Sequence, residues 1–246
     1  MTKRNLSLPD FTGRVVLVTG AAGSLGRVAS IALASAGAQL ILLDKAVAAL
    51  EQLSDEIAAA GHLLPALYPL DFLGATEEDY ETLAGIVDEN FGQLHGLLHS
   101  AADLGTLQPL ADVTAKAWQT VLLVNLTAPF LLTKALLPLL DRSGNASVVF
   151  TTDSSARGHK AYWGAYGLSK NALESLALSW AEELESQGRI RVNVFAPGPT
   201  RSVIRRKSHP GELLESLSSP DSLASSYVDL LHPTSHARSG EVVSPR

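Results

Sequence analysis

The chain has 246 residues, of which 46% are hydrophobic and 18% are charged, a composition typical of a globular protein that excludes a disordered one. Its 19 basic and 25 acidic residues give a net charge of −6, so no global positive field attracts nucleic acid or an anionic membrane. The lack of cysteine excludes disulfides, thiol catalysis and cysteine-ligated metals. We find no signal peptide and no run near 18 consecutive apolar residues, and therefore expect a cytoplasmic protein without membrane or nucleic-acid partners.

Short apolar runs that predict buried strands alternate along the chain with longer segments of helical periodicity. The expected strands span residues 14–19, 39–44, 63–70, 96–100, 146–151 and 189–195. The expected helices span residues 26–36, 46–60, 76–90, 115–140 (one long helix) and 165–186. This alternation predicts an α/β fold: a doubly wound parallel sheet with helices on both faces, in three layers.

The domain organisation follows from what the chain lacks. No linker, internal repeat or low-complexity tract interrupts it, so we expect one domain over residues 1–246. The serine-rich stretch 208–226 is the one weakly patterned region, and we interpret it as a loop with a short helix.

A glycine-rich loop follows the first expected strand, with the sequence Thr-Gly-Ala-Ala-Gly-Ser-Leu-Gly over residues 19–26. Small residues let such a turn close tightly and let the pyrophosphate of a dinucleotide approach the backbone. The next helix offers free N–H groups and the positive end of its dipole. The loop therefore predicts a dinucleotide site, the alternative being an ordinary strand-to-helix turn. The residues expected to bind are Gly20, Gly23, Ser24, Leu25 and Gly26.

Asp44 ends the second expected strand, 24 residues after Gly20. An acid at this distance accepts hydrogen bonds from the adenosine ribose hydroxyls and repels a 2′-phosphate, which favours NAD over NADP. Arg27 and Lys45 favour the phosphate instead, and a solvated strand end is the alternative interpretation of Asp44. We therefore expect NAD or NADP as the cofactor, with NAD slightly favoured, and Asp71 near the adenine amino group.

Tyr166 and Lys170 are four residues apart on an expected helix, where such residues share one face. An ammonium beside a phenol favours the phenolate, so we expect Lys170 to lower the pKa of Tyr166. A tyrosine of this kind can give a proton to a carbonyl oxygen or take one from an alcohol. The pair follows the fifth strand, downstream of a dinucleotide loop, and together these features indicate an oxidoreductase.

These residues resemble the short-chain dehydrogenase/reductase family, in its short single-domain branch. The resemblance extends from Gly13 to about Val243 and includes Asn125 and the run Pro-Gly-Pro-Thr at 197–200. Within the family, the runs at 163–166 and 191–193 resemble a YciK-like subgroup of bacterial oxidoreductases. The resemblance implies a single Rossmann-type, NAD(P)-binding domain that interconverts an alcohol and a carbonyl on a small molecule.

The resemblance also implies individual roles. Tyr166 is expected to be the general acid/base, and Lys170 to lower its pKa and bind the nicotinamide ribose. Asn125 is expected to bind a water that relays protons, and Thr200 to contact the carboxamide. Further cofactor contacts are implied for Ala101, Pro197 and Gly198.

Features outside the catalytic centre follow from the same resemblance. A loop over about 199–226 is expected to cover the substrate, and its basic run at 205–207 is either solvated or attracts an anionic substrate. A homodimer or homotetramer is expected through the helices that contain Asn125 and Tyr166. Four leucines are expected to face outward for this contact, namely Leu131, Leu132, Leu176 and Leu178.

Three positions depart from the family pattern. Gly23 stands one residue before the usual middle glycine, and residues 99–102 read His-Ser-Ala-Ala where the family has Asn-Asn-Ala-Gly. The family serine, 13 residues before the tyrosine, is Asp153 here. An ionised Asp153 would raise the pKa of Tyr166, whereas a protonated one could donate as serine does.

Ser154 is the other candidate for the serine role. We favour Ser154 as the catalytic residue, because a hydroxyl both donates and accepts. This choice predicts that Ser154→Ala lowers turnover more than Asp153→Asn does.

Two further expectations complete the sequence-based interpretation. His95 and His99 lie on a strand rather than on one helix face, so no metal site is expected. The alternative function is a dinucleotide-binding sensor or scaffold with little catalysis, which the altered motif at 99–102 and Asp153 suggest. A sugar-nucleotide epimerase or dehydratase is suggested by the glycine spacing but opposed by the length of the chain.

Overall fold

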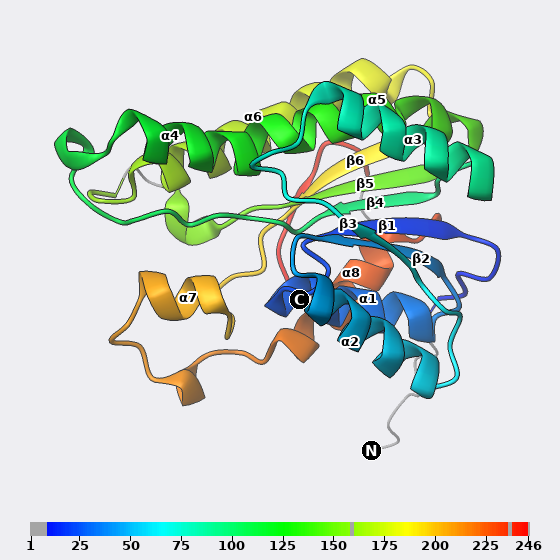
Figure 1. Ribbon diagram of the computed structural model, residues 1–246, viewed down its shortest axis with the longest axis horizontal. Coiled ribbons are helices and arrows are strands. Elements are labelled where there is room, and N and C mark those ends of the chain that lie inside the picture. Colours follow the sequence, from blue (N-terminus) through cyan, green and yellow to red (C-terminus); the bar gives the residue numbers. More distant parts are fainter. Residues whose placement is uncertain (1–8, 158–159, 236–237, 246) are drawn as a thin grey trace.

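The computed structural model describes residues 9–157, 160–235 and 238–245. Over these residues, seven parallel strands form one sheet in the order β3-β2-β1-β4-β5-β6-β7. The expected doubly wound α/β fold of one domain is confirmed (Figure 1). The strands are β1 (Val15–Thr19), β2 (Gln39–Asp44), β3 (Ala66–Pro69), β4 (Gly96–His99), β5 (Ala146–Thr151), β6 (Ile190–Phe195) and β7 (Val242–Val243).

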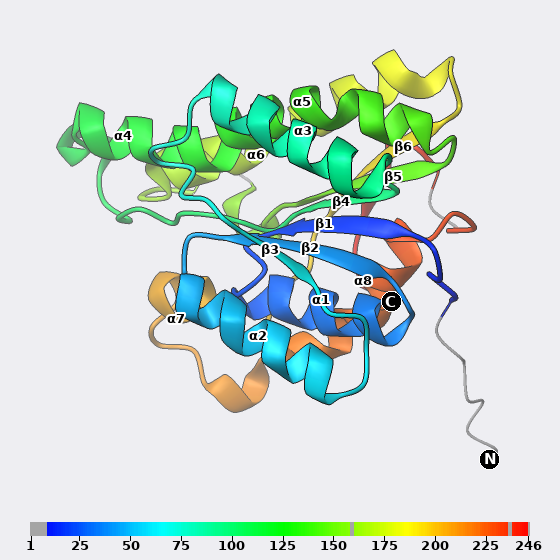
Figure 2. The same ribbon diagram turned by 45° about the vertical axis from the view of Figure 1, so that its right-hand side comes forward.

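Helices cover both faces of the sheet, so the molecule has three layers (Figures 1 and 2). One layer holds α3 (Glu77–Phe91), α4 (Ala115–Leu122), α5 (Ala128–Arg142) and α6 (Gly164–Glu185). The opposite layer holds α1 (Ser24–Ser35), α2 (Val47–Ala59) and α8 (Ala224–Leu231), and α7 (Val203–Ser208) lies on the same side (Figure 1).

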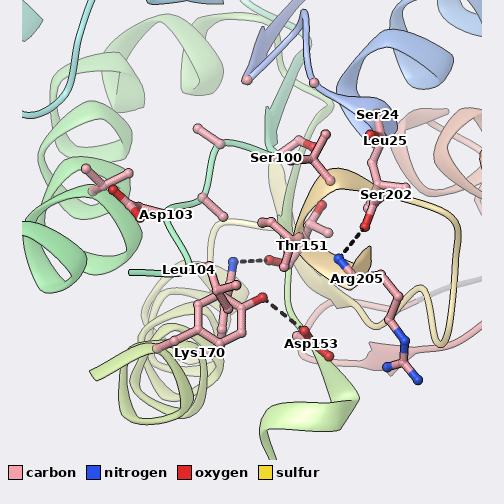
Figure 3. Close-up of a pocket in the computed structure, with 18 of the residues that line it drawn as sticks. Ser24, Leu25, Ser100, Asp103, Leu104, Thr151, Asp153, Lys170, Ser202 and Arg205 are labelled. Atoms are coloured by element: carbon pink, nitrogen blue, oxygen red, sulfur yellow. Dashed lines mark hydrogen bonds between the residues drawn. The ribbon is translucent and has the colours of Figure 1, made fainter. Parts of the chain in front are cut away.

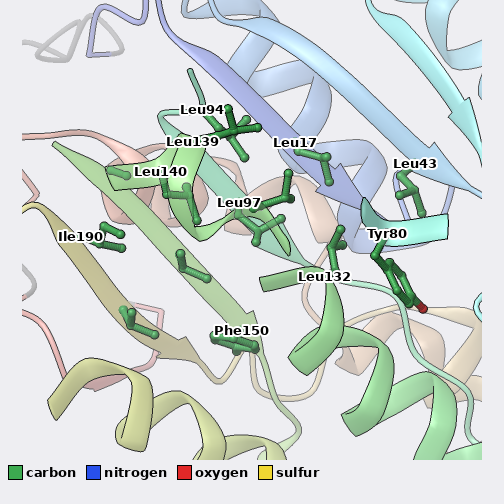
Figure 4. Close-up of a cluster of buried hydrophobic side chains, with 14 of the residues drawn as sticks. Leu17, Leu43, Tyr80, Leu94, Leu97, Leu132, Leu139, Leu140, Phe150 and Ile190 are labelled. Atoms are coloured by element: carbon green, nitrogen blue, oxygen red, sulfur yellow. The ribbon is translucent and has the colours of Figure 1, made fainter. Parts of the chain in front are cut away.

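The sheet is buried on both faces, which explains why its strands read as continuous apolar runs. Successive side chains of a strand point to opposite faces, and β1 illustrates the consequence. Leu17 packs in the core cluster under α3, α5 and α6, whereas Val16 and Val18 pack under α1, α2 and α8. Figure 4 shows Leu17 in the first cluster with Leu97 and Phe150.

The third strand is shorter than the expected 63–70, because β3 is limited to Ala66–Pro69. It lies at one edge of the sheet and pairs with β2. Proline has no N–H for a ladder bond, so an edge strand tolerates Pro69 where a central strand would not.

The expected long helix at 115–140 is interrupted. A π-helical turn, Leu123–Thr127, separates α4 from α5 and contains the buried Asn125. By length and composition, Ala115–Arg142 is long and apolar enough to cross a membrane. In the fold, however, its side chains Leu132, Leu136 and Leu139 are buried in the core cluster under the sheet, as in the core helix of a globular protein.

That packing corrects one expectation about the outer surface. Leu132 is fully buried, and Leu131 and Leu176 pack partly buried against the core. Leu178 alone of the four leucines is exposed, at 39%. Three of the four leucines thus contribute to the core under the sheet rather than to an outer contact face.

The C-terminal region has more structure than expected. The loop over 208–226 contains two 3₁₀ turns, Leu214–Ser216 and Pro220–Leu223. From Ala224 the stretch continues into α8, which buries Tyr227, Val228, Leu230 and Leu231 against the sheet and extends beyond the expected loop with its short helix. Residues 1–8, on which the expected lack of a signal peptide depended, lie outside the described residues.

Candidate active site

A cavity of about 490 Å³ opens at the carboxyl ends of the central strands. It lies where the strand order reverses, between β1 and β4, which is the usual ligand site of a doubly wound sheet. Most of the sequence-predicted residues meet there (Figure 3). Those that line the cavity are Gly20, Gly23, Ser24, Leu25, Asp44, Asp71, Ala101, Tyr166, Lys170, Pro197, Gly198 and Thr200.

The glycine loop forms one end of this cavity, and its shape depends on missing side chains. Gly20 has a φ of +61°, and a Cβ there would lie 2.6 Å from the Ala101 nitrogen. Gly26 does not line the cavity, but a Cβ on it would overlap the Gly20 carbonyl oxygen. Gly23 is the N-cap of α1 and no side chain caps this end, so the N–H groups of the first turn stay available to a ligand.

The charges around the adenosine end are unequally paired. Asp44 accepts hydrogen bonds at 3.1 Å from the backbone N–H groups of Ala22 and Ala46, which fixes its carboxylate at the cavity wall. Arg27 forms an ion pair with Glu56 of α2. Lys45 is exposed and lines the cavity. Of the two cations that could meet a 2′-phosphate, Lys45 is therefore the one that faces the site.

Tyr166 stands at the other end of the cavity, on the first turn of α6, with 3% of its surface exposed. Its Oη donates a hydrogen bond of 2.9 Å to Oδ2 of Asp153, which follows β5. Burial and the neighbouring Asp153 carboxylate raise the pKa of Tyr166 above its ordinary value. Both effects oppose the lowering of this pKa that is expected from Lys170, and that lowering stays a prediction.

Lys170 is buried one turn further along α6. Its Nζ donates to the backbone oxygen of Thr151 at 3.1 Å and lies 5.9 Å from the centre of the Tyr166 ring (Figure 3). Burial lowers the pKa of Lys170 to about 8, against the opposing effect of Asp153 and Glu174. The ammonium is thus held at the end of β5, where it lines the cavity.

Asn125 does not line the cavity, but its side chain holds together two segments that do. Its Oδ1 accepts from the Asp103 N–H at 2.7 Å, and its Nδ2 donates to the Asp103 oxygen and to Ser169 Oγ. Ser169 Oγ donates in turn to the Tyr166 carbonyl. Asn125 therefore ties the segment after β4 to the helix that contains Tyr166.

The sequence favoured Ser154 over Asp153 as the residue beside Tyr166, and the structure has the opposite arrangement. Ser154 opens a 3₁₀ turn, Ser154–Ala156, and does not line the cavity, whereas Asp153 does. The Asp153 side chain caps this turn by accepting from the Ser155 N–H at 2.8 Å. The structure thus brings Asp153, and not Ser154, to Tyr166.

Several cavity residues had no signal in the sequence. Leu104 and Ile204 belong to an apolar cluster with Trp163 and Tyr166, and reach it from the segments after β4 and β6. Arg205 pairs with Glu212 and donates to Ser155 Oγ at 2.7 Å, so the first residue of the basic run is neither simply solvated nor free for a substrate. Apart from the Arg205–Glu212 pair, these contacts join segments distant in sequence, which no local pattern reveals. Among the described residues, no group of three or more His, Asp or Glu is arranged to hold a metal ion.

A doubly wound parallel sheet with an uncapped glycine loop and a buried Tyr–Lys pair at its switch point defines an NAD(P)-binding oxidoreductase. The family model of the short chain dehydrogenases matches residues 14–213. The chain belongs to this family.

Relatives agree with the assignment and with the YciK-like resemblance. The chain is 38% identical to the uncharacterized oxidoreductase YciK of Escherichia coli (strain K12), over 92% of this chain and 89% of the relative. A short chain dehydrogenase structure from Pseudomonas syringae has 39% identity and a TM-score of 0.94, with both chains fully covered. One from Shigella flexneri complexed with NADP has 36% identity and a TM-score of 0.90, covering 96% of this chain and 98% of that one.

Proposed function

We propose that this protein is an NAD(P)(H)-dependent oxidoreductase that interconverts an alcohol and a carbonyl on a small molecule, with Tyr166 as its general acid/base. The observation that supports this most is the position of Tyr166. Its buried phenol lines the same cavity as the glycine loop, and Lys170 lies one turn further along the helix. A proton-transfer group and the proposed dinucleotide site share one cavity.

The residues present fit a dinucleotide. Gly20 and Gly23 line the cavity with backbone alone, and the uncapped start of α1 favours an anionic pyrophosphate. Ser24 and Leu25 would bind it, Asp44 the adenosine ribose, Asp71 the adenine, and Lys170, Gly198 and Thr200 the nicotinamide end. When bound, the nicotinamide supplies hydride transfer.

The chain's own groups then handle the proton and the surroundings. Tyr166 Oη would exchange a proton with the substrate oxygen. The Lys170 ammonium would stabilise negative charge that develops on Tyr166 Oη during this exchange. Asn125 would keep the segment after β4 against α6, in addition to the water relay that the family implies. The apolar cluster of Leu104, Trp163 and Ile204 would exclude water from the reacting atoms.

The cofactor preference rests on Asp44, and we propose NAD(H) as the better ligand. Asp44 is fixed at the cavity wall by two backbone N–H groups, so it cannot readily turn away from a 2′-phosphate. Lys45 opposes this preference because it faces the same region. The Shigella flexneri relative was complexed with NADP, which does not favour NAD and makes the preference a matter for direct titration.

A dinucleotide-binding sensor or scaffold is the second candidate. The observation that favours it is the hydrogen bond from Tyr166 to Asp153, which engages the phenol that catalysis needs. A sensor would bind the dinucleotide with the same glycine loop and would not depend on Tyr166.

The test is a fluorescence titration of the purified protein with NADH and NADPH, followed by a screen at 340 nm with alcohols and carbonyls. We expect tight binding of a dinucleotide and turnover of at least one substrate class. In Tyr166→Phe we expect the binding to stay within about twofold while turnover is lost. Binding without any turnover, unchanged in Tyr166→Phe, would establish the sensor instead.

A homodimer or homotetramer and a cytoplasmic location stay predictions. The α5–α6 layer supports the first, because Phe130 and Leu178 are 38% and 39% exposed on it and Phe130 stacks on Trp180. Sedimentation at micromolar concentration measures the oligomeric state.

A further inference from the structure

The hydrogen bond between Tyr166 and Asp153 has a defined direction. A carboxylate only accepts hydrogen bonds, so the 2.9 Å bond must contain the phenolic proton. The other Asp153 oxygen accepts from the Ser155 N–H at 2.8 Å. The phenol therefore donates a hydrogen bond to Asp153 and presents a lone pair of Oη to the cavity.

A substrate that reaches Oη from the cavity meets an acceptor. An alcohol O–H can donate to that lone pair, whereas a carbonyl oxygen, which has no proton, would face two acceptor oxygens. With Asp153 ionised, the arrangement is thus matched to the alcohol. It becomes matched to the carbonyl once Asp153 has taken up a proton, because the phenolic proton can then turn toward the cavity.

We propose that Asp153 is the terminal proton acceptor of this centre, linked to the substrate through Tyr166. The inference rests on the proposed alcohol and carbonyl function. During oxidation, the alcohol proton moves to Tyr166 Oη while the phenolic proton moves to Asp153 Oδ2. The carbon–hydrogen bond breaks, its electron pair leaves with the hydrogen as hydride to the oxidised nicotinamide, and the carbon–oxygen double bond forms. The products are a carbonyl, the reduced cofactor and a neutral Asp153, whose proton passes to solvent through the cavity it lines.

The surroundings of Tyr166 favour a concerted transfer. Burial and Asp153 raise the pKa of Tyr166, so a free phenolate is costly here. In the two-proton transfer the phenol loses one proton as it gains another, and no phenolate has to form. Asp153 therefore limits the negative charge that the Lys170 ammonium has to stabilise at Tyr166 Oη.

The charged groups around Asp153 come from two elements, α6 and α7. Lys170 on α6 is buried beside it, and the Asp153 charge acts on its ammonium. Glu174 lies one turn further on α6, bound to Thr152 and Arg157. From the α7 side come His209, on which Asp153 also acts, and Arg205, whose charge is matched by Glu212. Lys170 is thus the buried cation available to balance Asp153 in its ionised form.

A purely structural role for Asp153 is the competing explanation, because its side chain also caps the turn Ser154–Ala156. Asp153→Asn separates the two roles: an amide oxygen can still cap the turn but cannot take up a proton. Asp153→Glu restores a carboxylate, and Asp55→Asn on the exposed face of α2 is the matched control for the chemistry of the substitution.

The kinetic experiment measures kcat/KM against pH in both directions, with an alcohol and carbonyl pair found by the screen. We expect Asp153→Asn to lose at least about 100-fold in both directions, by the same factor at a given pH because the equilibrium constant is unchanged. The fall of wild-type oxidation in acid should be absent in Asp153→Asn. Asp153→Glu should recover at least about tenfold over Asp153→Asn, and Ser154→Ala should lose less than Asp153→Asn.

A second readout needs neither cofactor nor substrate. Ionisation of tyrosine is followed by absorbance near 295 nm in the wild type, Asp153→Ser and Asp153→Ser/Tyr166→Phe. One tyrosine should ionise at lower pH in Asp153→Ser, and this step should be missing in the double variant. Identical titrations of wild type and Asp153→Ser would overturn the link between the two side chains.

The outcomes separate the two proposals. Wild-type turnover with an Asp153→Asn profile of unchanged height and shape contradicts the role of Asp153 and leaves the proposed function intact. Wild-type binding of NADH without turnover of any alcohol or carbonyl contradicts the proposed function, and with it the role of Asp153.

Discussion

The two ends of the cavity are built on different principles. At the glycine-loop end, the backbone of Gly20, Gly23 and the first turn of α1 forms the surface, and side chains are missing by necessity. At the Tyr166 end, buried polar side chains form it, each held by a partner from another element. The first end is defined by steric limits and the second by charge and hydrogen bonding. Substitutions should therefore fail differently at the two ends.

The largest effect is expected at the glycine-loop end. In Gly26→Ala the added Cβ would overlap the Gly20 carbonyl oxygen, which belongs to rigid backbone. We expect a loss of about 3 kcal/mol or more of the free energy of unfolding, and no measurable NADH binding. The matched control is Gly85→Ala in α3, where nothing lies within 4 Å of the new Cβ. It should stabilise the protein by about 0.5–1 kcal/mol, as urea unfolding would measure. Equal stabilities of the two variants would remove the steric basis of the comparison.

At the Tyr166 end, Tyr166→Phe should separate binding from chemistry. Loss of the phenol removes the proton-transfer group and should lower kcat by about 100-fold to 10,000-fold. The glycine loop is untouched, so the Kd for NADH should change by less than about twofold. Stopped-flow turnover and fluorescence titration on the same preparation provide both numbers. A variant that loses binding and turnover together would show that the two ends are not independent.

A third prediction concerns the imidazole of His99, whose pKa is influenced by its burial and by Lys170 at the same end. Burial lowers the pKa of His99 to about 3, and its Nε2 is bonded to Thr133 Oγ1 at 2.9 Å. Between pH 6.5 and 3 the unfolded chain binds a proton that the folded chain does not, so stability falls as the pH falls through this window. At pH 5 the cost is about 2 kcal/mol relative to neutral pH. His99→Gln should flatten the pH dependence of the free energy of unfolding between pH 7 and pH 5 by this amount. Parallel curves for wild type and variant would contradict it.

The smallest effect is expected at Asp44, the carboxylate that lies at the glycine-loop end of the cavity. Asp44→Asn keeps an acceptor for the Ala22 N–H but removes the charge that repels a 2′-phosphate. The ratio of NADPH to NADH affinity should rise about tenfold. Lys45→Ala should lower NADPH affinity and leave NADH affinity unchanged, so it should change the affinity ratio in the opposite direction. An unchanged ratio in both variants would assign cofactor choice to other residues.

The glycine loop and the strand pattern were predictable because they depend on local rules. Buried strands read as apolar runs, and the strands at 39–44 and 146–151 appear with the expected bounds. The exceptions have local causes as well. Pro65 and Pro69 shorten β3 at the sheet edge, and the serine-rich composition before Tyr227 concealed the full extent of α8.

The Tyr166 end was predictable only in part. The spacing of Tyr166 and Lys170 correctly placed both side chains at the cavity, since residues four apart share a helix face. The sequence could not tell which of Asp153 and Ser154 meets the phenol, because adjacent residues at a strand end point in different directions. The geometry favours a larger loss for Asp153→Asn than for Ser154→Ala, the reverse of the order expected from the sequence.

By itself, the sequence determined the class of fold, the order of its elements, the glycine loop and the family to which the chain belongs. These depend on periodicity, on a glycine-rich run after a strand and on the spacing of Tyr166 and Lys170, which are local properties of a chain. Only the tertiary structure decided that Asp153 bonds Tyr166, that Asn125 braces the segment after β4, and that Leu132 is buried. Each of these depends on contacts between segments far apart in sequence and on the burial that changes the pKa values of the groups involved.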